Sequence, residues 1–480
     1  MDRPSWAGVG RWAVGLVGAA LVGCGEVPSG SIVLTQVPVN PVQVQTPGGG
    51  PDERYPAGSR VVLLLAPAAQ GGIRILSKGL VAAGDPIVAP AADRVLFVGR
   101  RRSGDDWQVY ETPLTGGRPK QVTYVSGGAA SPALLANGSV VFSSPTPKTK
   151  DLWGNKTGIA IYKQAPGGTP KRLTYGLSAA IEPTVMADGR ILFVSAHPSR
   201  DDAASPSLGL FTINDDGTEL TAFAADHDGA PEIHRPRELL DGRVAFLARP
   251  GAGSGCGTVI EAVQKARPFA SRRPLFAAPI GQCGSIEPRG PNELLVCASG
   301  PAADGKFVSM GVFQVERPND SLGKPVFNDP SWRTVEAVPV QPREAPTGHV
   351  SAMATEKNTG TILCLNVNFT RGPGHDARSR ATRVRVLTGR SPGNVQVLGE
   401  VRVQTDGSFM ARVPADTPLG FESLDANGQV LQRLAPVLWV RAGENRSCIG
   451  CHEPSNRSPR NARPLAVLEP PVDLIPRDLP

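Results

Sequence analysis

The sequence predicts an all-β protein in which a β-propeller is followed by a small β-sandwich-like domain. Glycine and proline are so frequent among the 480 residues, at 55 and 47, that long helices are not expected. A turn followed by an apolar strand recurs five times, at intervals of 44 to 53 residues, which indicates a repeat architecture. Beyond the repeat, four segments alternate apolar and polar residues as half-buried strands do.

The N-terminus predicts export from the cytoplasm. Arg3 and Arg11 precede an apolar run over residues 13–22, which is too short for a hydrocarbon core that needs roughly 20 residues. The run ends in LVGC and resembles the lipobox of bacterial lipoproteins, which implies a signal peptide over residues 1–23 and a lipid on Cys24. The alternative is plain secretion with an incidental cysteine. The resemblance implies a periplasmic or cell-surface lipoprotein, held to the outer membrane through its lipid anchor.

The segment after this cysteine predicts a tether. Residues 24–58 are rich in Gly, Pro, Val and Gln without helical periodicity, so we expect a flexible linker there. The net charge of +7 is modest for this length, and the basic residues form no stripe interleaved with aromatic residues. Nucleic acid is therefore excluded as a partner.

The five repeats predict the blades of the propeller. Their strands have the sequences DRVLFV, NGSVVF, DGRILF, DGRVAF and NELLVC and begin at Asp93, Asn137, Asp188, Asp241 and Asn292. Units of this length hold three or four short strands, as propeller blades do. Strands in residues 60–80 could close the ring with those after Trp332, which predicts six blades over residues 59–345. The pattern resembles TolB-like periplasmic proteins, and an array of β-sandwiches is the alternative.

Polar residues precede the proline of four repeats. They are Ser131, Glu182, Arg235 and Glu287, and His234 adjoins the third of them. If these residues open strands near the central channel, they could bind a small ligand, a metal or a loop of a partner, or they could simply be solvated. A metal site is also conceivable in the loops expected around His197 and His227, with Asp201, Asp202, Asp226 and Asp228, although no ligand spacing supports it.

The second domain is predicted over residues 346–460, and a Pro-rich tail over residues 461–480. The expected strands are TILCLNVNF, ATRVRVL, NVQVLGEVRV and SFMARV, beginning at Thr361, Ala381, Asn394 and Ser408. Their apolar and polar positions alternate, which is typical of strands with one buried face. We therefore expect a small β-sandwich.

The motif CIGCH ends this domain and predicts one covalent haem c. The spacing of Cys448 and Cys451 lets both thiols reach the two vinyl groups of one porphyrin, and His452 is placed to ligate the iron. A disulfide or half of a zinc site is the alternative, which the expected export disfavours. The sequence therefore predicts a haem c domain in which His452 is the metal ligand.

The surrounding sequence is more specific than the motif. GEVRVQTDGSFMARVPADTPLGFESLDANGQVLQ, followed by VRAGENRSCIGCHE, resembles the haem-bearing middle domain of the hydrazine synthase alpha subunit family over residues 360–455. The resemblance implies an exported propeller protein in which the cysteines and histidine of CIGCH hold the haem. Two departures speak against hydrazine synthesis itself. The chain has one CxxCH motif, and Leu434, Ala435 and Pro436 replace the usual Met-Arg-Ser.

The sixth iron ligand stays open at this stage. The candidates are His375, His349, Met353, Met410 or no protein ligand. Five arginines flank the motif against Glu444 and Glu453, and they could pair with haem propionates, steer an acidic partner or be solvated. These arginines are Arg441, Arg446, Arg457, Arg460 and Arg463.

Three functions follow from these expectations. The first is an electron-transfer lipoprotein whose propeller docks a redox partner protein, the second a haem oxidoreductase acting on a small nitrogen or oxygen compound. The third is a propeller that binds a ligand or a protein, with a structural haem. Of the other cysteines, Cys256 and Cys283 could form a disulfide, whereas Cys297 and Cys364 are expected to be buried thiols.

Overall fold

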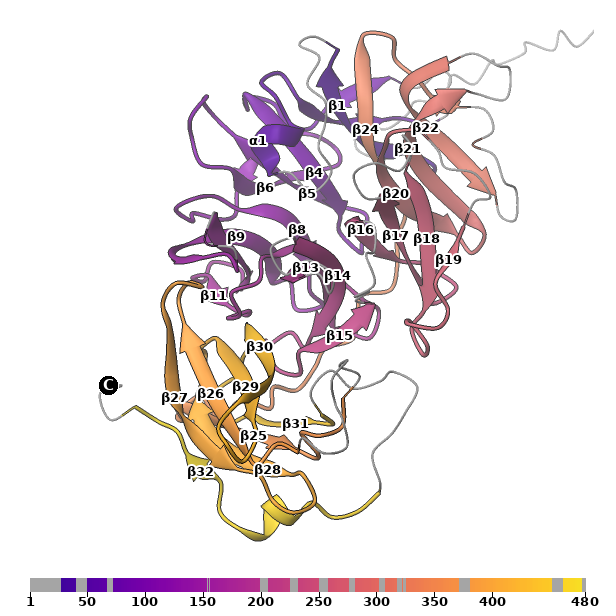
Figure 1. Ribbon diagram of the computed structural model, residues 1–480. Helices are drawn as coiled ribbons and strands as arrows, with labels where there is room; N and C mark the ends of the chain where they lie inside the picture. The colour runs from indigo at the N-terminus through magenta and orange to yellow at the C-terminus, as the bar shows by residue number, and fades with distance from the viewer. Residues whose placement is uncertain are drawn as a thin grey trace, which may run out of the picture.

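The computed structural model describes residues 27–39, 50–66, 72–152, 154, 156–198, 206–224, 232–249, 258–275, 281–301, 307–316, 322, 325–370, 380–450 and 461–476. These residues form eight four-stranded sheets, as Figure 1 shows, and the all-β prediction is confirmed. The helical elements described are the single turns α1 (Pro51–Arg54) and η1 (Leu465–Leu468). Within the described ranges, no helix has the length and apolar character needed to cross a membrane.

One sheet joins the two ends of the repeat region. Its order is β24-β1-β2-β3, formed by β24 (Trp332–Pro339), β1 (Ile32–Pro38), β2 (Arg60–Leu64) and β3 (Ile73–Ile75). Strand β1 pairs antiparallel with β24 on one side and with β2 on the other. The strand after Trp332 thus shares a sheet with those of residues 60–80, as was expected for the closure of the ring.

Five more sheets each use four consecutive strands. They are β4 (Ala82–Val88), β5 (Arg94–Arg100), β6 (Gln108–Pro113) and β7 (Lys120–Gln121); β8 (Ala130–Leu134), β9 (Val140–Lys150), β10 (Thr157–Gln164) and β11 (Lys171–Arg172); β12 (Ala180–Val185), β13 (Ile191–Pro198), β14 (Pro206–Ile213) and β15 (Thr221–Ala224); β16 (Glu232–Glu238), β17 (Arg243–Arg249), β18 (Val259–Gln264) and β19 (Arg273–Pro274); β20 (Cys283–Gly290), β21 (Glu293–Pro301), β22 (Phe307–Glu316) and β23 (Pro325–Phe327). The first strands, β24, β4, β8, β12, β16 and β20, contact one another in a closed cycle. We call these six sheets the propeller-like ring.

The repeat motif supplies the packing between the sheets. Phe97, Phe142, Phe193 and Phe246 lie in the strand motif of four successive repeats, the last three at its end, and each is at most 1% exposed. A buried aromatic side chain at this position removes a large apolar area from water in every sheet. The fifth repeat has Cys297 there, which is fully buried in the same manner. The residues that recur in the sequence repeat are therefore the ones that recur in the buried core of successive sheets.

The predicted flexible linker over residues 24–58 is wrong where those residues are described. Strand β1 lies between β24 and β2, and its residues Ile32, Val33 and Leu34 are at most 1% exposed. The segment before β2 forms α1 and buries Tyr55. The Gly and Pro residues around IVLTQVP made this strand look like a linker. Its apolar side chains are buried because β24, from the end of the repeat region, pairs with it.

The remaining two sheets form the second unit, which we call the sandwich. One has the order β31-β25-β28-β32 and the other β27-β26-β29-β30, from β25 (Thr359–Cys364), β26 (Arg383–Gly389), β27 (Val395–Arg402), β28 (Phe409–Pro414), β29 (Leu419–Leu424), β30 (Val430–Leu438), β31 (Asn445–Cys448) and β32 (Val472–Asp473). Side chains from both sheets meet in one core, which includes Ile362, Val386 and Phe421. In Figure 1 the sandwich lies beside β11 and β15 of the ring.

The predicted separate tail is also wrong over residues 461–476. Strand β32 pairs parallel with β28, and Leu474 is 6% exposed in the sandwich core. Ala466 of η1 is buried as well, and its N–H donates to Ser408 Oγ at 3.0 Å. The few apolar residues of this Pro-rich segment are enough to seat it on the sandwich.

Candidate functional site

A repeated backbone irregularity aims polar side chains at the centre of the ring. Asp85, Ser131, Glu182 and Arg235 each precede a proline, and each has a φ between 50° and 58°. The strand register shifts at each of these points, as it does at a β-bulge. Bulges redirect a side chain at a cost in backbone strain, so this conformation indicates a role beyond pairing.

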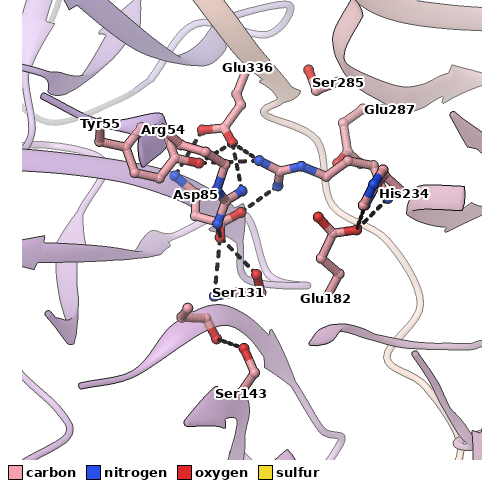
Figure 2. Close-up of polar contacts among 12 residues, drawn as sticks. Arg54, Tyr55, Asp85, Ser131, Ser143, Glu182, His234, Ser285, Glu287 and Glu336 are labelled. Atoms are coloured by element: carbon pink, nitrogen blue, oxygen red, sulfur yellow. Dashed lines mark hydrogen bonds and ion pairs between the residues drawn. The ribbon is translucent and has the colours of Figure 1, made fainter. Parts of the chain in front are cut away.

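These side chains meet in a buried ionic network, which Figure 2 shows. The Arg235 guanidinium contacts Asp85 at 2.6 Å and also pairs with Glu336, and Arg54 contacts Asp85 at 2.9 Å. Tyr55 Oη donates to Glu336 Oε1 at 2.5 Å, and Asp85 N–H donates to Glu336 Oε2 at 2.8 Å. The network therefore joins α1 and β4 from the start of the repeat region, β16 from its middle and β24 from its end.

Opposite charges hold this network in its ionised form. Burial alone would raise the pKa of the Asp85 carboxyl, but Arg54 and Arg235 outweigh burial and hold that pKa well below its usual range. Burial likewise opposes the charge on Arg235, yet Asp85 and Glu336 raise its pKa well above normal. Burial raises the pKa of Tyr55 strongly, so its hydroxyl keeps the proton that it donates.

A second buried pair adjoins the network. His234 Nδ1 lies 3.6 Å from Glu182 Oε2, and His234 Nε2 lies 3.7 Å from Glu232. Burial would lower the pKa of His234, but Glu182 overrides it and raises the pKa to about 9. Burial would raise the pKa of Glu182, but His234 brings it down to about 2. The Arg235 N–H also donates to Glu182 Oε2 at 2.6 Å, which ties this pair to the network.

Little space is left at the centre. The cavity beside the network has a volume of about 30 Å³, and its lining includes Arg54, Tyr55, Arg235 and Glu336. About 10–15 Å³ of such volume is enough for one water, so this cavity has room for a few waters. The expectation that the polar residues are solvated is wrong, because Ser131, Glu182 and Arg235 are 5 to 7% exposed. They neutralise one another and fill the channel.

The sequence analysis missed four members of the network. Asp85 precedes Pro86 in the same pattern as Ser131 before Pro132, so the repeat could have revealed it. Arg54 and Tyr55 lie in the segment that was expected to be a linker. Glu336 is a single acidic residue in a largely apolar strand, and its neighbours in the sequence give no indication that it faces the centre. Glu287, which was expected at the centre with the others, pairs with Arg237 instead.

The suggested metal site has no support in the described part of the chain. His197 lies in strand β13 opposite Ser207, and not in a loop as expected. His227 and the four aspartates of that suggestion are outside the described residues. The described ranges contain no group of three or more His, Cys, Asp or Glu residues placed to hold a metal ion.

The haem motif begins at the end of edge strand β31. Cys448 is half-buried there and pairs in parallel with Cys364 of β25. Leu365 N–H donates to Cys448 O at 2.8 Å, and Asn366 N–H donates to Ile449 O at 3.2 Å. Backbone pairing therefore holds the first residues of CIGCH at an accessible edge.

Close packing continues to Gly450. A Cβ at this position would lie 2.2 Å from Phe369 O, so only glycine fits without a shift of the backbone. Ile449 beside it is 39% exposed. An accessible thiol followed by an exposed apolar side chain fits a thioether bond to a porphyrin edge. Cys451, His452 and Cys24 lie outside the described residues, so their predicted roles stay predictions.

Two of the flanking arginines have another role than the one expected. Arg441 Nε contacts Asp416 at 2.7 Å, and its Nη1 donates to Asp216 O of the ring at 2.5 Å. Arg446 Nη2 donates to Leu220 O, also of the ring. Both side chains therefore bind the sandwich to the ring. Arg463 is exposed, and Arg457, Arg460 and Glu453 lie outside the described residues.

Further bonds make this joint between ring and sandwich specific. Glu444, which is 5% exposed, accepts N–H bonds from Arg441 at 2.7 Å and from Glu219 of the ring at 3.0 Å. Burial raises the pKa of Glu444. Trp439 Nε1 donates to Gly217 O at 3.0 Å. The segment between β30 and β31 is thus fixed on the ring directly before the haem motif.

The candidate sixth ligands are spread over the molecule. His349 is exposed in the connection between ring and sandwich, and Met353 is half-buried there. Met410 pairs with Leu363, so it lies on the face of the sheet opposite to that of Cys364 and Cys448. His375 lies outside the described residues.

The other cysteines are buried. Cys283 is a free thiol, 3% exposed, and burial raises its pKa to about 12. Cys256, its suggested partner, lies outside the described residues. Cys297 and Cys364 are at most 2% exposed, as expected for strand core.

Comparison with known proteins finds similarity over both the ring and the sandwich. Residues 335–453 match the family model described as the hydrazine synthase alpha subunit middle domain. The chain is 22% identical to hydrazine synthase subunit alpha of Kuenenia stuttgartiensis over 90% of its own length. The chain is a distant homologue of hydrazine synthase subunit alpha. It spans 66% of the length of that relative.

One solved structure shares the fold of both units. The structure of Kuenenia stuttgartiensis hydrazine synthase superposes with a TM-score of 0.75 at 20% identity, over 92% of this chain and 72% of that one. TolB from Acinetobacter baumannii matches with a TM-score of 0.40 at 15% identity, over 61% of this chain and 65% of its own. The first match extends across ring and sandwich, so the two-unit architecture is shared with the hydrazine synthase chain.

Proposed function

We propose that this protein is an exported c-type cytochrome, in which a six-bladed propeller supports a small haem c domain that transfers electrons. The observation that carries the proposal is the half-buried thiol of Cys448, held at the open end of β31 at the start of CIGCH. This motif lies within residues 335–453, which match the hydrazine synthase alpha subunit middle domain.

The residues present fit a covalent haem. Cys448 and Cys451 would form the thioether bonds, and His452 would ligate the iron, which supplies one-electron redox chemistry when the haem is bound. The joint formed by Arg441, Glu444 and Trp439 would hold the attachment strand in a fixed position against the ring. A fixed cofactor near the surface suits electron transfer to a redox partner protein.

The ring supports a docking role better than a substrate site. Its centre is occupied by buried, paired charges, and the cavity of about 30 Å³ beside them has room for a few waters. The outer strands and loops are then the surfaces available to a partner. With a lipid on Cys24, the protein would stay at the periplasmic or cell-surface side of the outer membrane.

A second candidate function is a haem oxidoreductase acting on a small nitrogen or oxygen compound. The observation that favours it is the distant homology to hydrazine synthase subunit alpha over 90% of the chain. The chain differs from the family at Leu434, Ala435 and Pro436, so hydrazine synthesis itself is not proposed.

Absorbance spectra distinguish the two functions. The protein is made together with a cytochrome c maturation system and measured oxidised, reduced, and reduced with carbon monoxide. Electron transfer predicts a six-coordinate, low-spin spectrum that carbon monoxide does not change. A high-spin spectrum that shifts with carbon monoxide would support the enzyme instead, and protein without covalent haem would refute both.

A further inference from the structure

Two cysteines lie side by side at the start of the haem motif. Cys448 of β31 is the register partner of Cys364 of β25, and the bond from Leu365 N–H to Cys448 O at 2.8 Å fixes this register. Partners at one level of neighbouring strands direct their side chains to the same face. Strands lie about 4.8 Å apart, which is within the range of roughly 4.4–6.8 Å between the Cα atoms of disulfides.

The two thiols differ in access. Cys364 is 2% exposed and belongs to the sandwich core, whereas Cys448 is half-buried on the edge strand. A dissolved oxidant therefore reaches Cys448 first, and Cys364 lies behind it in position to react next. An accessible thiol backed by a buried one is the arrangement needed for a disulfide that forms in two steps.

We propose that the haem-free chain forms a disulfide between Cys364 and Cys448, which blocks the thiol that haem attachment needs. The disulfide itself requires only the geometry of β25 and β31. Its consequence rests on the proposed function, because a chain in this state must be reduced before Cys448 can bond to a porphyrin.

The chemistry balances with a disulfide oxidant such as oxidised glutathione. The Cys448 thiolate attacks the oxidant, which forms a mixed disulfide and releases one glutathione. The Cys364 thiolate then attacks the Cys448 sulfur, and the second glutathione leaves with a proton. Two protein thiols are oxidised to one disulfide, and one glutathione disulfide is reduced to two thiols.

Cys297 provides a control within the same chain. It is fully buried in β21, where its register partner is Ser285, and the neighbouring Cys283 of β20 is buried as well. Burial raises its pKa well above normal, so it stays a protonated thiol. Under the conditions that link Cys364 to Cys448, Cys297 should remain unmodified until the protein is denatured.

The test uses the full chain produced without a maturation system. The reduced protein is treated with oxidised glutathione, quenched, alkylated and digested, and the disulfides are mapped by mass spectrometry. We expect a predominant Cys364–Cys448 linkage and a mass lower by two hydrogens. In Cys364→Ser, which keeps the size of the side chain, Cys448 should no longer be linked to β25. A predominant Cys448–Cys451 linkage, or Cys448 left bound to glutathione in the natural chain, would overturn the proposal.

A second measurement separates this proposal from the function. Cys364→Ser and the natural chain are produced with the maturation system, with and without added thiol reductant, and their covalent haem is compared. We expect the reductant to increase haem attachment in the natural chain and to have no effect in Cys364→Ser. Linkage without any haem attachment would refute the cytochrome alone, whereas haem attachment without linkage would refute the disulfide alone.

Discussion

The centre of the ring and the end of β31 both contain reactive side chains, but those at the centre are buried and paired, whereas the one on β31 is accessible. At the centre, Asp85 and Arg235 are buried, paired and closed off by Arg54 and Tyr55. At β31, Cys448 stands half-buried on an open strand edge. Charges that neutralise one another stabilise a fold, whereas an accessible thiol beside a free edge is available for chemistry. Perturbed pKa values alone would select the centre of the ring, and not the strand end that is proposed to hold a haem.

The largest effect is expected at β31. In the double variant Cys448→Ser, Cys451→Ser, covalent haem should be lost completely, because no thiol of the motif is left to bond to the porphyrin. The mass and the absorbance of the denatured protein measure this loss. Cys297→Ser is the matched control and should keep its haem. Covalent haem in the double variant would show that the end of β31 is not the site of haem attachment.

The next effect belongs to the ring. Arg235→Met removes one of the two buried cations that Asp85 and Glu336 share, the other being Arg54, and we expect a loss of about 3–5 kcal/mol in the free energy of unfolding. Denaturant titration measures it. Arg243→Met is the control in the same sheet, because its ion pair with Asp241 is about one third exposed and should contribute less than about 1 kcal/mol. Equal effects of the two substitutions would contradict a stabilising centre.

The pair His234–Glu182 predicts a pH dependence of stability. The pKa of Glu182 falls from 4.5 to about 2 on folding, so its contribution is present above pH 4.5 and is lost as the pH falls toward 2. The pKa of His234 rises from 6.5 to about 9, so its contribution is present below pH 6.5 and is lost as the pH rises toward 9.

Urea unfolding between pH 2 and pH 10 tests this dependence. The natural chain should be more stable than Glu182→Gln, His234→Gln by on the order of 2 kcal/mol between pH 4.5 and 6.5. The difference should shrink toward both ends of the range. A constant difference across the range would show that the pair is not ionised as inferred.

The smallest effect tests whether the close packing of Gly450 after β31 positions the haem motif. A methyl group in Gly450→Ala would meet Phe369 O at 2.2 Å, so the start of the motif must shift, at a cost of about 1–3 kcal/mol. We expect less haem attachment without global unfolding, measured as the ratio of haem to protein. Gly393→Ala is the control, since a methyl group there has no neighbour within 4 Å. Equal haem content in both variants would mean that this close packing does not position the motif.

Much of the architecture was predictable because it is local. The repeated turn and strand predicted the six sheets of the ring. Ser131, Glu182 and Arg235, which precede repeat prolines, were also correctly expected near the centre, and Glu287 pairs with Arg237 outside the network. Strand β1, however, lacked a turn motif of its own, and its partner β24 follows almost 300 residues later in the printed sequence.

The sequence by itself determined the repeat, the strand patterns and the CIGCH motif, because each depends on residues close together in the chain. Only the tertiary structure decided that Arg54 and Tyr55 fill the ring, that Arg441 and Arg446 bind the sandwich to it, and that Cys448 lies beside Cys364. Those contacts join residues 30 to more than 280 positions apart, and their energies depend on burial and register, which exist only once the sheets have closed.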